Sequence, residues 1–253
     1  MPKFWNFIKN AATETEPESV ELRIEGDIIS DSDVWLYEWF GETATSPNAF
    51  KSELAEHAGK DITVWIDSYG GDIFAGTGIY NALMEHKKTG AKITTKAEKA
   101  MSAATFPFMT GDERLVTPGG IVMIHEPLTP NAAGYASDLR QFADVLDEVK
   151  EAIINIYELG SGRSRAKISA MMKNETYMSA RTAIKEGFAT GMLYSEQVQE
   201  QAPESMLNFS RHAIINSATE TMRKVTEFTR KRTRAEPKNT DALKAKLALE
   251  LIL

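Results

Sequence analysis

The chain of 253 residues contains no cysteine. Disulfide bonds, thiolate metal sites and a cysteine nucleophile are therefore excluded, and the absence suits a reducing cytoplasm. The sequence also lacks any apolar run of about 18 residues, the length that a membrane-spanning helix requires. Its N-terminus has neither the apolar core nor the cleavage site of a secretory signal. We therefore expect a cytoplasmic protein with no membrane partner.

An excess of positive charge is missing over most of the sequence, where acidic residues outnumber basic ones. The net charge is −7, but residues 223–253 contain nine Lys or Arg and four Asp or Glu, which leaves residues 1–222 at −12. Binding to nucleic acid requires clustered basic side chains that contact phosphates, so the acidic part argues against such a partner. The basic tail could bind nucleic acid weakly, but we prefer a solvated, partly helical tail.

Patterns of strands and helices alternate between residues 20 and 198. Alternating apolar and polar residues predict a strand at 20–29, and a short apolar run predicts another at 61–67. Helical spacing of apolar residues predicts a long helix at 136–159. The alternation predicts an α/β fold with a mostly parallel sheet. We expect three parts: a flexible arm (1–19), a folded domain (20–198), and a tail (199–253) that is polar, then basic, and helical or disordered.

Gly70 and Gly71 lie between a predicted strand and a predicted helix at 74–88. Paired glycines let the backbone approach a ligand and present N–H groups to it, although a plain tight turn explains the pair as well. The motifs G-x-x-x-x-G-K-[ST] and G-x-G-x-x-G are both absent, which disfavours binding of a nucleotide or dinucleotide.

Ser102 stands among small residues, after a strand-like segment and at the start of an apolar one. This is the setting of a nucleophile elbow, in which the serine Oγ is exposed and the following N–H groups point toward one spot. The motif G-x-S-x-G itself is missing. A serine that only caps a helix fits the same position.

His125 ends the second strand of a predicted hairpin, whose turn is expected at 117–120. At the end of a buried strand an imidazole reaches the sheet edge, where sites form, although a structural histidine would fit there too. Glu175 could orient that imidazole as a triad acid does. Alternatively, Glu175 is a surface acid beside a helix that Ser179 caps.

Taken in this order, the segments resemble the Clp protease proteolytic-subunit family over roughly residues 20–195. The resemblance is carried by Asp67-Ser68-Tyr69-Gly70-Gly71, Met123-Ile124-His125-Glu126-Pro127, Gly134-Tyr135-Ala136-Ser137-Asp138-Leu139 and Tyr177-Met178-Ser179-Ala180. It implies an α/β spiral of βαβ units with a long handle helix, a fold that crotonase-like enzymes share.

The resemblance also implies a serine endopeptidase with Ser102 as nucleophile, His125 as base and Glu175 as the acid that orients it. The oxyanion hole would use backbone N–H groups of Gly71 and Ala103, with Gly70 shaping the turn. No metal and no cofactor are implied. The implied partners are a polypeptide substrate and further copies of the chain in a homo-oligomeric ring, single or stacked as a double ring. An AAA+ unfoldase is compatible with this function but not required.

Within the family, the chain looks most like the phage-encoded head maturation (prohead) proteases. The features of that type are Phe4-Trp5-Asn6-Phe7, Ala100-Met101-Ser102-Ala103-Ala104, Glu175-Thr176-Tyr177 and the charged tail with Lys244-Ala245-Lys246-Leu247. This likeness predicts processing of a capsid or scaffold protein in the host cytoplasm or the assembling prohead.

Three alternatives stay open. A crotonase-like acyl-CoA enzyme would share the fold and the oxyanion hole but would not need Ser102 and His125 together. A Ser–Lys dyad could use Lys96 or Lys99, although enzymes of that kind usually carry a membrane segment. A subunit that keeps the fold but has lost activity would serve only in assembly.

The apolar stripe of the long predicted helix allows two interpretations. A monomer would expose the stripe, which favours an interface between rings, whereas packing within the domain explains it without any partner. Its members are Leu139, Phe142, Leu146, Val149, Ile153 and Ile156.

Overall fold

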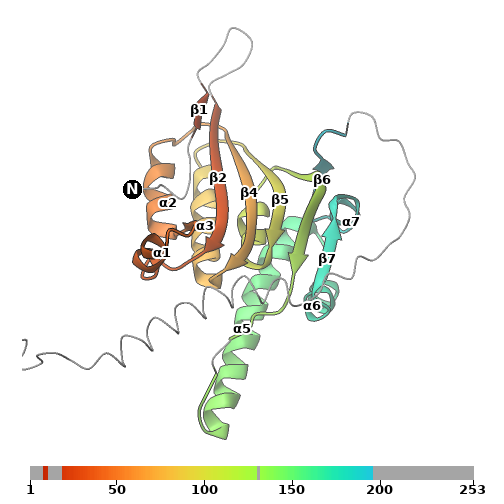
Figure 1. Cartoon of the computed structure of the whole chain (residues 1–253). Helices are drawn as coiled ribbons and strands as arrows, with labels where there is room; N and C mark the ends of the chain where they lie inside the picture. The colour runs from red at the N-terminus through yellow and green to blue at the C-terminus, as the bar shows by residue number, and fades with distance from the viewer. Residues whose placement is uncertain (1–7, 11–18, 130–131, 196–253) are drawn as a thin grey trace, which may run out of the picture. The chain divides into compact units, whose positions relative to one another are not determined.

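The computed structural model describes residues 8–10, 19–129 and 132–195. Most of the predicted arm and the whole predicted tail from residue 199 lie outside these residues. In the described part, an eight-stranded sheet is combined with helices, as Figure 1 shows. The predicted α/β fold is confirmed.

The sheet has the order β1-β2-β4-β5-β6-β7, with β3 beside β2 and β8 beside β6. Strands β2, β4, β5 and β6 run parallel, whereas β1 and β7 pair antiparallel at the two edges. The bounds are β1 (Ile8–Asn10), β2 (Ser19–Ile28), β3 (Ala44–Thr45), β4 (Ile62–Gly71), β5 (Ile93–Met101), β6 (Glu113–Ile124), β7 (Thr176–Ser179) and β8 (Gly191–Met192).

Helices connect the parallel strands, as βαβ units require. Helix α3 joins β4 to β5 and contacts both α2 and α4. The bounds are α1 (Val34–Phe40), α2 (Pro47–Ala55), α3 (Ile73–Lys87), the 3-10 turn η1 (Ser102–Ala104), α4 (Thr105–Phe108), α5 (Ala136–Ser161), α6 (Arg165–Lys173) and α7 (Ala180–Lys185). Among the described residues, no helix is both long and apolar enough to cross a membrane.

Alternation of side chains along the strands builds the core. Ile62, Val64 and Ile66 of β4 are buried, while the residues between them are only partly so. Successive side chains of a strand point to opposite faces, so one face of the sheet receives this apolar set. The alternation expected at 20–29 is confirmed in β2, where Val20 and Leu22 are fully buried.

The hairpin predicted at 115–125 is wrong. Both halves of this segment pair in the same parallel direction with β5, Val116 with Ala97 and Ile121 with Lys99, so the chain does not reverse. Residues 117–120 instead form a bulge opposite Glu98 alone. A Cβ on Gly120 would lie 2.8 Å from the carbonyl oxygen of Ala97. The bulge therefore requires a glycine at this position, although the sequence suggests a turn.

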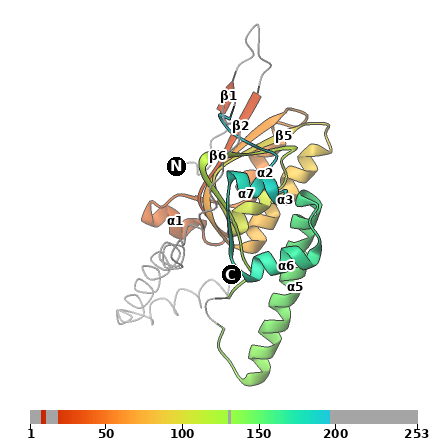
Figure 2. The same ribbon diagram turned by 90° about the vertical axis from the view of Figure 1, so that its right-hand side faces the viewer.

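Helix α5 is the predicted handle helix, and its two halves differ in environment. Ile153 and Ile156 are buried in the domain core, and Val149 packs against that core. Leu139 and Phe142, one turn apart in the N-terminal half, remain 44% and 45% exposed. Figure 2 shows this half extending beyond the sheet. Packing within the domain therefore explains only the C-terminal half of the stripe.

Candidate active site at the ends of three strands

The predicted site residues Ser102 and His125 lie at the carboxyl ends of neighbouring strands. Met101 of β5 is paired with Met123 of β6, and the two strands are parallel, so their carboxyl ends lie at one edge of the sheet. Ser102 follows β5 directly, and His125 follows β6 directly. The fold therefore brings together two residues that are 23 positions apart in the sequence.

Ser102 Oγ and His125 Nε2 are 2.7 Å apart and form a hydrogen bond. Ser102 has a φ of 52°, a left-handed conformation that non-glycine residues adopt rarely and that is common at strained functional turns. A serine on a sharp turn between a strand and a helix presents its Oγ outward. When Nε2 is unprotonated, the imidazole accepts this hydrogen bond and can take the hydroxyl proton.

The environment of His125 keeps its imidazole neutral. Burial lowers the pKa of His125 below its ordinary value of 6.5. A hydrogen bond with the backbone of Glu126 and the charge of Glu175 act in the opposite direction but do not outweigh the burial. Near neutral pH the ring therefore retains a free lone pair, as a general base requires.

Glu175 approaches His125 from the neighbouring strand. Ile124 of β6 is paired with Thr176 of β7, and the two strands are antiparallel. His125 follows Ile124 and Glu175 precedes Thr176, so both residues lie just beyond the last pair, at the same end of this ladder. Glu175 is partly buried, has a φ of 46°, and its charge raises the pKa of the imidazole. That it holds the histidine tautomer stays a prediction.

Gly70 and Gly71 are the last two residues of β4 and do not form the separate turn that the sequence suggests. Neighbouring backbone atoms lie so close to both positions that only glycine fits there. Gly70 has a φ of 100°, and a Cβ there would lie 2.7 Å from Ser102 Cβ and 2.9 Å from the amide nitrogen of Ala103. Gly71 has a φ of 144°, and its Cβ would collide with the carbonyl oxygen of Ile28 at 2.1 Å. Neither position accepts a side chain without movement of the backbone.

The N–H group of Gly70 is engaged inside the protein. It donates to Ser68 Oγ at 3.1 Å, and Ser68 Oγ in turn donates to the carbonyl of Gly26 at 2.5 Å. The Gly70 N–H is therefore already bonded within the protein, and Gly71 and Ala103 remain the predicted oxyanion donors. Nothing in the sequence marks Ser68 for this role, because a serine two residues before a pair of glycines has no distinctive spacing.

The two lysines near the serine have other partners. Lys99 Nζ forms an ion pair with Asp67 at 2.7 Å and lies 4.9 Å from the centre of the Tyr69 ring. Although burial lowers it, the pKa of Lys99 is raised overall by Asp67, whereas a lysine base needs a lowered pKa. Lys96 lies over the Trp65 ring at 5.0 Å. These contacts disfavour a Ser–Lys dyad.

Thr105 and Tyr157 also belong to the surroundings of Ser102, although no sequence pattern predicts them there. Thr105 Oγ1 donates to the carbonyl of Ser102 at 2.5 Å and lies 2.6 Å from the hydroxyl of Tyr157. Tyr157 is 52 positions away on α5, so no local spacing could have joined the pair. In the described part of the chain, no group of three or more metal-ligating side chains is present.

Comparison with known proteins gives one consistent family. A family model described as Clp protease matches residues 51–196. An ATP-dependent Clp protease proteolytic subunit of Bacteroides fragilis is 31% identical over 135 residues, which cover 53% of this chain and 65% of that protein. The corresponding subunit of Porphyromonas gingivalis is 30% identical, over 53% of this chain and 60% of that protein. The matched region therefore spans less than two thirds of these relatives.

Proposed function

The chain belongs to the Clp protease family, and on that premise we propose that it is a serine-type endopeptidase. The observation that carries the proposal is the hydrogen bond of 2.7 Å between Ser102 Oγ and His125 Nε2. A nucleophile in contact with a buried, neutral base is the minimal arrangement for acyl transfer.

The proposed reaction has two halves. Ser102 Oγ attacks the carbonyl carbon of the scissile peptide bond while His125 Nε2 takes the hydroxyl proton. The tetrahedral intermediate then breaks its C–N bond, and the protonated imidazole gives the proton to the leaving amine. Water next attacks the acyl-serine ester, with His125 again as base, and releases the carboxylate product and free Ser102.

Charge develops on the carbonyl oxygen during each attack. In the proposal, the N–H groups of Gly71 and Ala103 donate to this oxygen, as in other oxyanion holes. Glu175 lies just beyond the end of the β6–β7 ladder, at the same end as His125, and would stabilise the imidazolium that forms transiently. No cofactor takes part in any of these steps.

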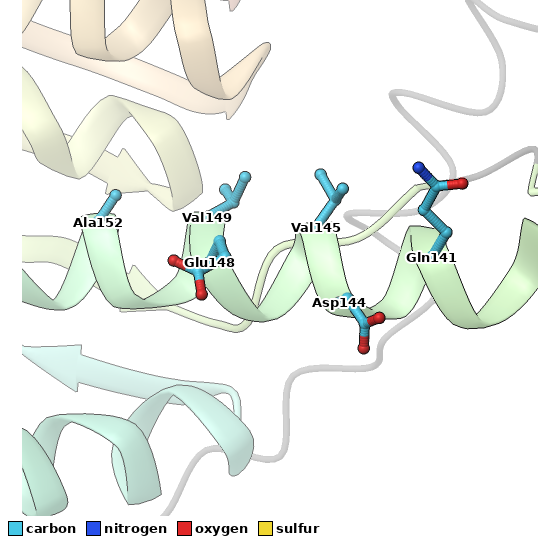
Figure 3. Close-up of a pocket in the computed structure, with 6 residues that line it drawn as sticks. All are labelled: Gln141, Asp144, Val145, Glu148, Val149 and Ala152. Atoms are coloured by element: carbon cyan, nitrogen blue, oxygen red, sulfur yellow. The ribbon is translucent and has the colours of Figure 1, made fainter.

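We further propose that the exposed half of α5 joins copies of the chain into a ring, or two rings into a stack. Leu139 and Phe142 are exposed there, and Val145 is 53% exposed. A shallow groove of about 380 Å³ runs along the same helix between Gln141 and Ala152. Figure 3 shows the side chains that line it. Apolar side chains grouped on one protruding helix favour an interface with another copy.

The finer part of the proposal concerns the substrate. Phage head maturation is supported by the serine context Ala100–Ala104 and by Glu175-Thr176-Tyr177, both typical of that branch. The N-terminal and C-terminal features of the same branch lie outside the described residues. Cleavage of a capsid or scaffold protein inside an assembling shell would not require an AAA+ unfoldase, although one is compatible with it.

Two other functions fit the fold less well. A crotonase-like acyl-CoA enzyme needs an oxyanion hole but gives no reason for the contact between Ser102 and His125. An inactive assembly subunit gives no reason to keep Ser102 in its left-handed conformation, which costs about 1–3 kcal/mol. The proposal accounts for both features.

Hydrolysis of fluorogenic peptides of varied sequence by the full chain tests the activity. We expect turnover by the wild type and none by Ser102→Ala at equal oligomeric state. For the substrate, the capsid protein of the same genome should be shortened when coexpressed with the wild type and stay full length with Ser102→Ala. Peptide turnover that persists in Ser102→Ala would overturn the proposal, and an intact capsid protein would overturn only its finer part.

A further inference from the structure

A directed chain of hydrogen bonds runs from helix α5 to the turn that carries Ser102. Thr105 has one hydroxyl hydrogen, and it is donated to the carbonyl oxygen of Ser102 at 2.5 Å. The contact of 2.6 Å between Thr105 Oγ1 and the Tyr157 hydroxyl therefore needs Tyr157 as the donor. The order is Tyr157 to Thr105 to the Ser102 carbonyl.

The donor end of this chain is held rigidly. Tyr157 and Thr105 are both buried, and the Tyr157 ring lies 6.1 Å from the Phe106 ring and 5.4 Å from the Phe188 ring. Burial raises the pKa of Tyr157 far above its ordinary value, so the hydroxyl keeps its proton at any working pH. A buried hydroxyl without a partner is costly, which favours the bonded arrangement.

The last acceptor of this series of hydrogen bonds, the Ser102 carbonyl, also determines the direction of the Ala103 N–H group. The carbonyl of Ser102 and the N–H of Ala103 belong to the same peptide unit, which is planar and trans. They point in opposite directions, so a hydrogen bond that fixes the carbonyl also fixes the direction of the N–H. Rotation of this unit would turn the Ala103 N–H away from an oxyanion.

We propose that Thr105 and Tyr157 are positioning residues that aim the Ala103 N–H at the oxyanion. The inference rests on the proposed peptidase function and deepens it. It also makes the oxyanion hole depend on α5, since Tyr157 belongs to the buried half of the handle helix. Neither residue touches the substrate in this role.

Kinetics of four variants test the proposal. Thr105→Val removes the hydroxyl donor to the Ser102 carbonyl and leaves the bond from the backbone N–H of residue 105 to the same carbonyl. We expect kcat to fall about 10- to 100-fold, less than the loss of a whole oxyanion donor, with KM little changed. In Tyr157→Phe, Thr105 can still donate to the Ser102 carbonyl, but its hydroxyl no longer accepts the hydrogen bond from Tyr157 that orients and polarises it. We therefore expect kcat to fall about 3- to 10-fold. Thr105→Ser keeps the hydroxyl and should recover most of the activity.

The matched control is Thr110→Val. Thr110 is also buried and also donates to the carbonyl three residues earlier, Pro107, at 2.7 Å. Thr110→Val should reduce stability without a selective loss of kcat, because the carbonyl of Pro107 does not share a peptide unit with a proposed oxyanion donor. A fall in kcat as large as that of Thr105→Val would overturn the inference and show a general packing effect.

The outcomes separate this inference from the function on which it rests. A wild type that hydrolyses no peptide overturns both. An active wild type, with Thr105→Val and Tyr157→Phe at wild-type kcat, overturns the positioning role alone. If Thr105→Val does not fold, Tyr157→Phe decides, because its ring still fills the same space: a reduced kcat at unchanged KM supports the role, and an unchanged kcat overturns it.

Discussion

At the scale of single residues, the site depends on a few backbone conformations that side-chain chemistry alone would not predict. Ser102 and Glu175 both have positive φ values, and Gly70 must lack a side chain because Ser102 and Ala103 pack against its Cα. Unfavourable conformations of this kind persist only where the surrounding structure enforces them. Their concentration around one serine–histidine pair is what distinguishes this edge of the sheet from an ordinary helix cap.

The pH dependence of kcat/KM follows from the burial of His125. Its pKa lies below 6.5 in the folded chain, and only the neutral ring acts as a base. Activity should therefore fall as the pH drops through this lowered pKa, so that the midpoint of the acid limb lies below pH 6.5. The free energy of unfolding should change with pH in the same direction. The contribution of the neutral ring is fully present above pH 6.5 and is lost as the pH falls through the folded-state pKa. An acid limb centred above pH 6.5 would contradict this prediction.

Glu175→Gln tests the third member of the proposed triad. Removing the carboxylate charge takes away an influence that raises the pKa of His125, so the acid limb should move to lower pH. We also expect kcat to fall about 10²- to 10⁴-fold. Glu126→Gln is a suitable control, because Glu126 lies next to His125 but its side chain pairs with Lys150. Equal effects in the two variants would show that Glu175 has no special role.

At the scale of elements, Arg114 connects the start of β6 to the ends of two helices. Its guanidinium donates to the carbonyls of Phe188 at 2.9 Å, Gly111 at 3.0 Å and Gly160 at 3.0 Å. A further bond of 3.3 Å reaches Gly187. One side chain therefore pairs carbonyls from α5, from the turn after α7 and from the loop before β6.

Arg114→Met should destabilise the fold by about 3 kcal/mol. Hydrogen bonds to a charged group contribute about 1.5–3 kcal/mol each, are not additive, and leave carbonyls unpaired when removed. Urea denaturation followed by circular dichroism measures the change. Arg181→Met, an exposed position on α7, should change stability by about 0.5 kcal/mol or less. A similar small change for Arg114→Met would show that the network is not stabilising.

The elements also show what the sequence could and could not predict. Periodicity predicts the buried strands and the helices α3 and α5, because these patterns depend on local burial. It gives Ser102 and His125 as candidates, because each follows a strand. The parallel bulge at 117–120 and the strand β7 were missed, since both are defined by a partner strand. Thr105 and Tyr157 were missed because only tertiary packing joins them.

At the scale of the whole molecule, α5 has two roles in one helix. Its C-terminal half belongs to the core and contacts the Ser102 turn through Tyr157. Its N-terminal half exposes apolar side chains that the described residues leave uncovered. Assembly through the exposed half would therefore act on the same rigid element that supports the proposed oxyanion hole.

Charge placed on the exposed half should prevent assembly. We expect Leu139→Glu with Phe142→Glu to yield a particle of lower mass by analytical ultracentrifugation, because two buried charges would be desolvated at an interface. Ser137→Glu with Arg140→Gln adds the same net charge to the opposite face of the same turns and should leave the mass unchanged. A double variant with wild-type mass would exclude this face as the interface.

The proposed function depends on the activation of Ser102 by His125 for nucleophilic attack. The most direct measurement is reaction of the purified, assembled chain with a fluorophosphonate, with the adduct located by mass spectrometry. We expect an adduct on Ser102 in the wild type and in Ser137→Ala, no adduct in Ser102→Ala, and a strongly reduced rate in His125→Ala. An unlabelled wild type, or undiminished labelling in His125→Ala, would contradict it.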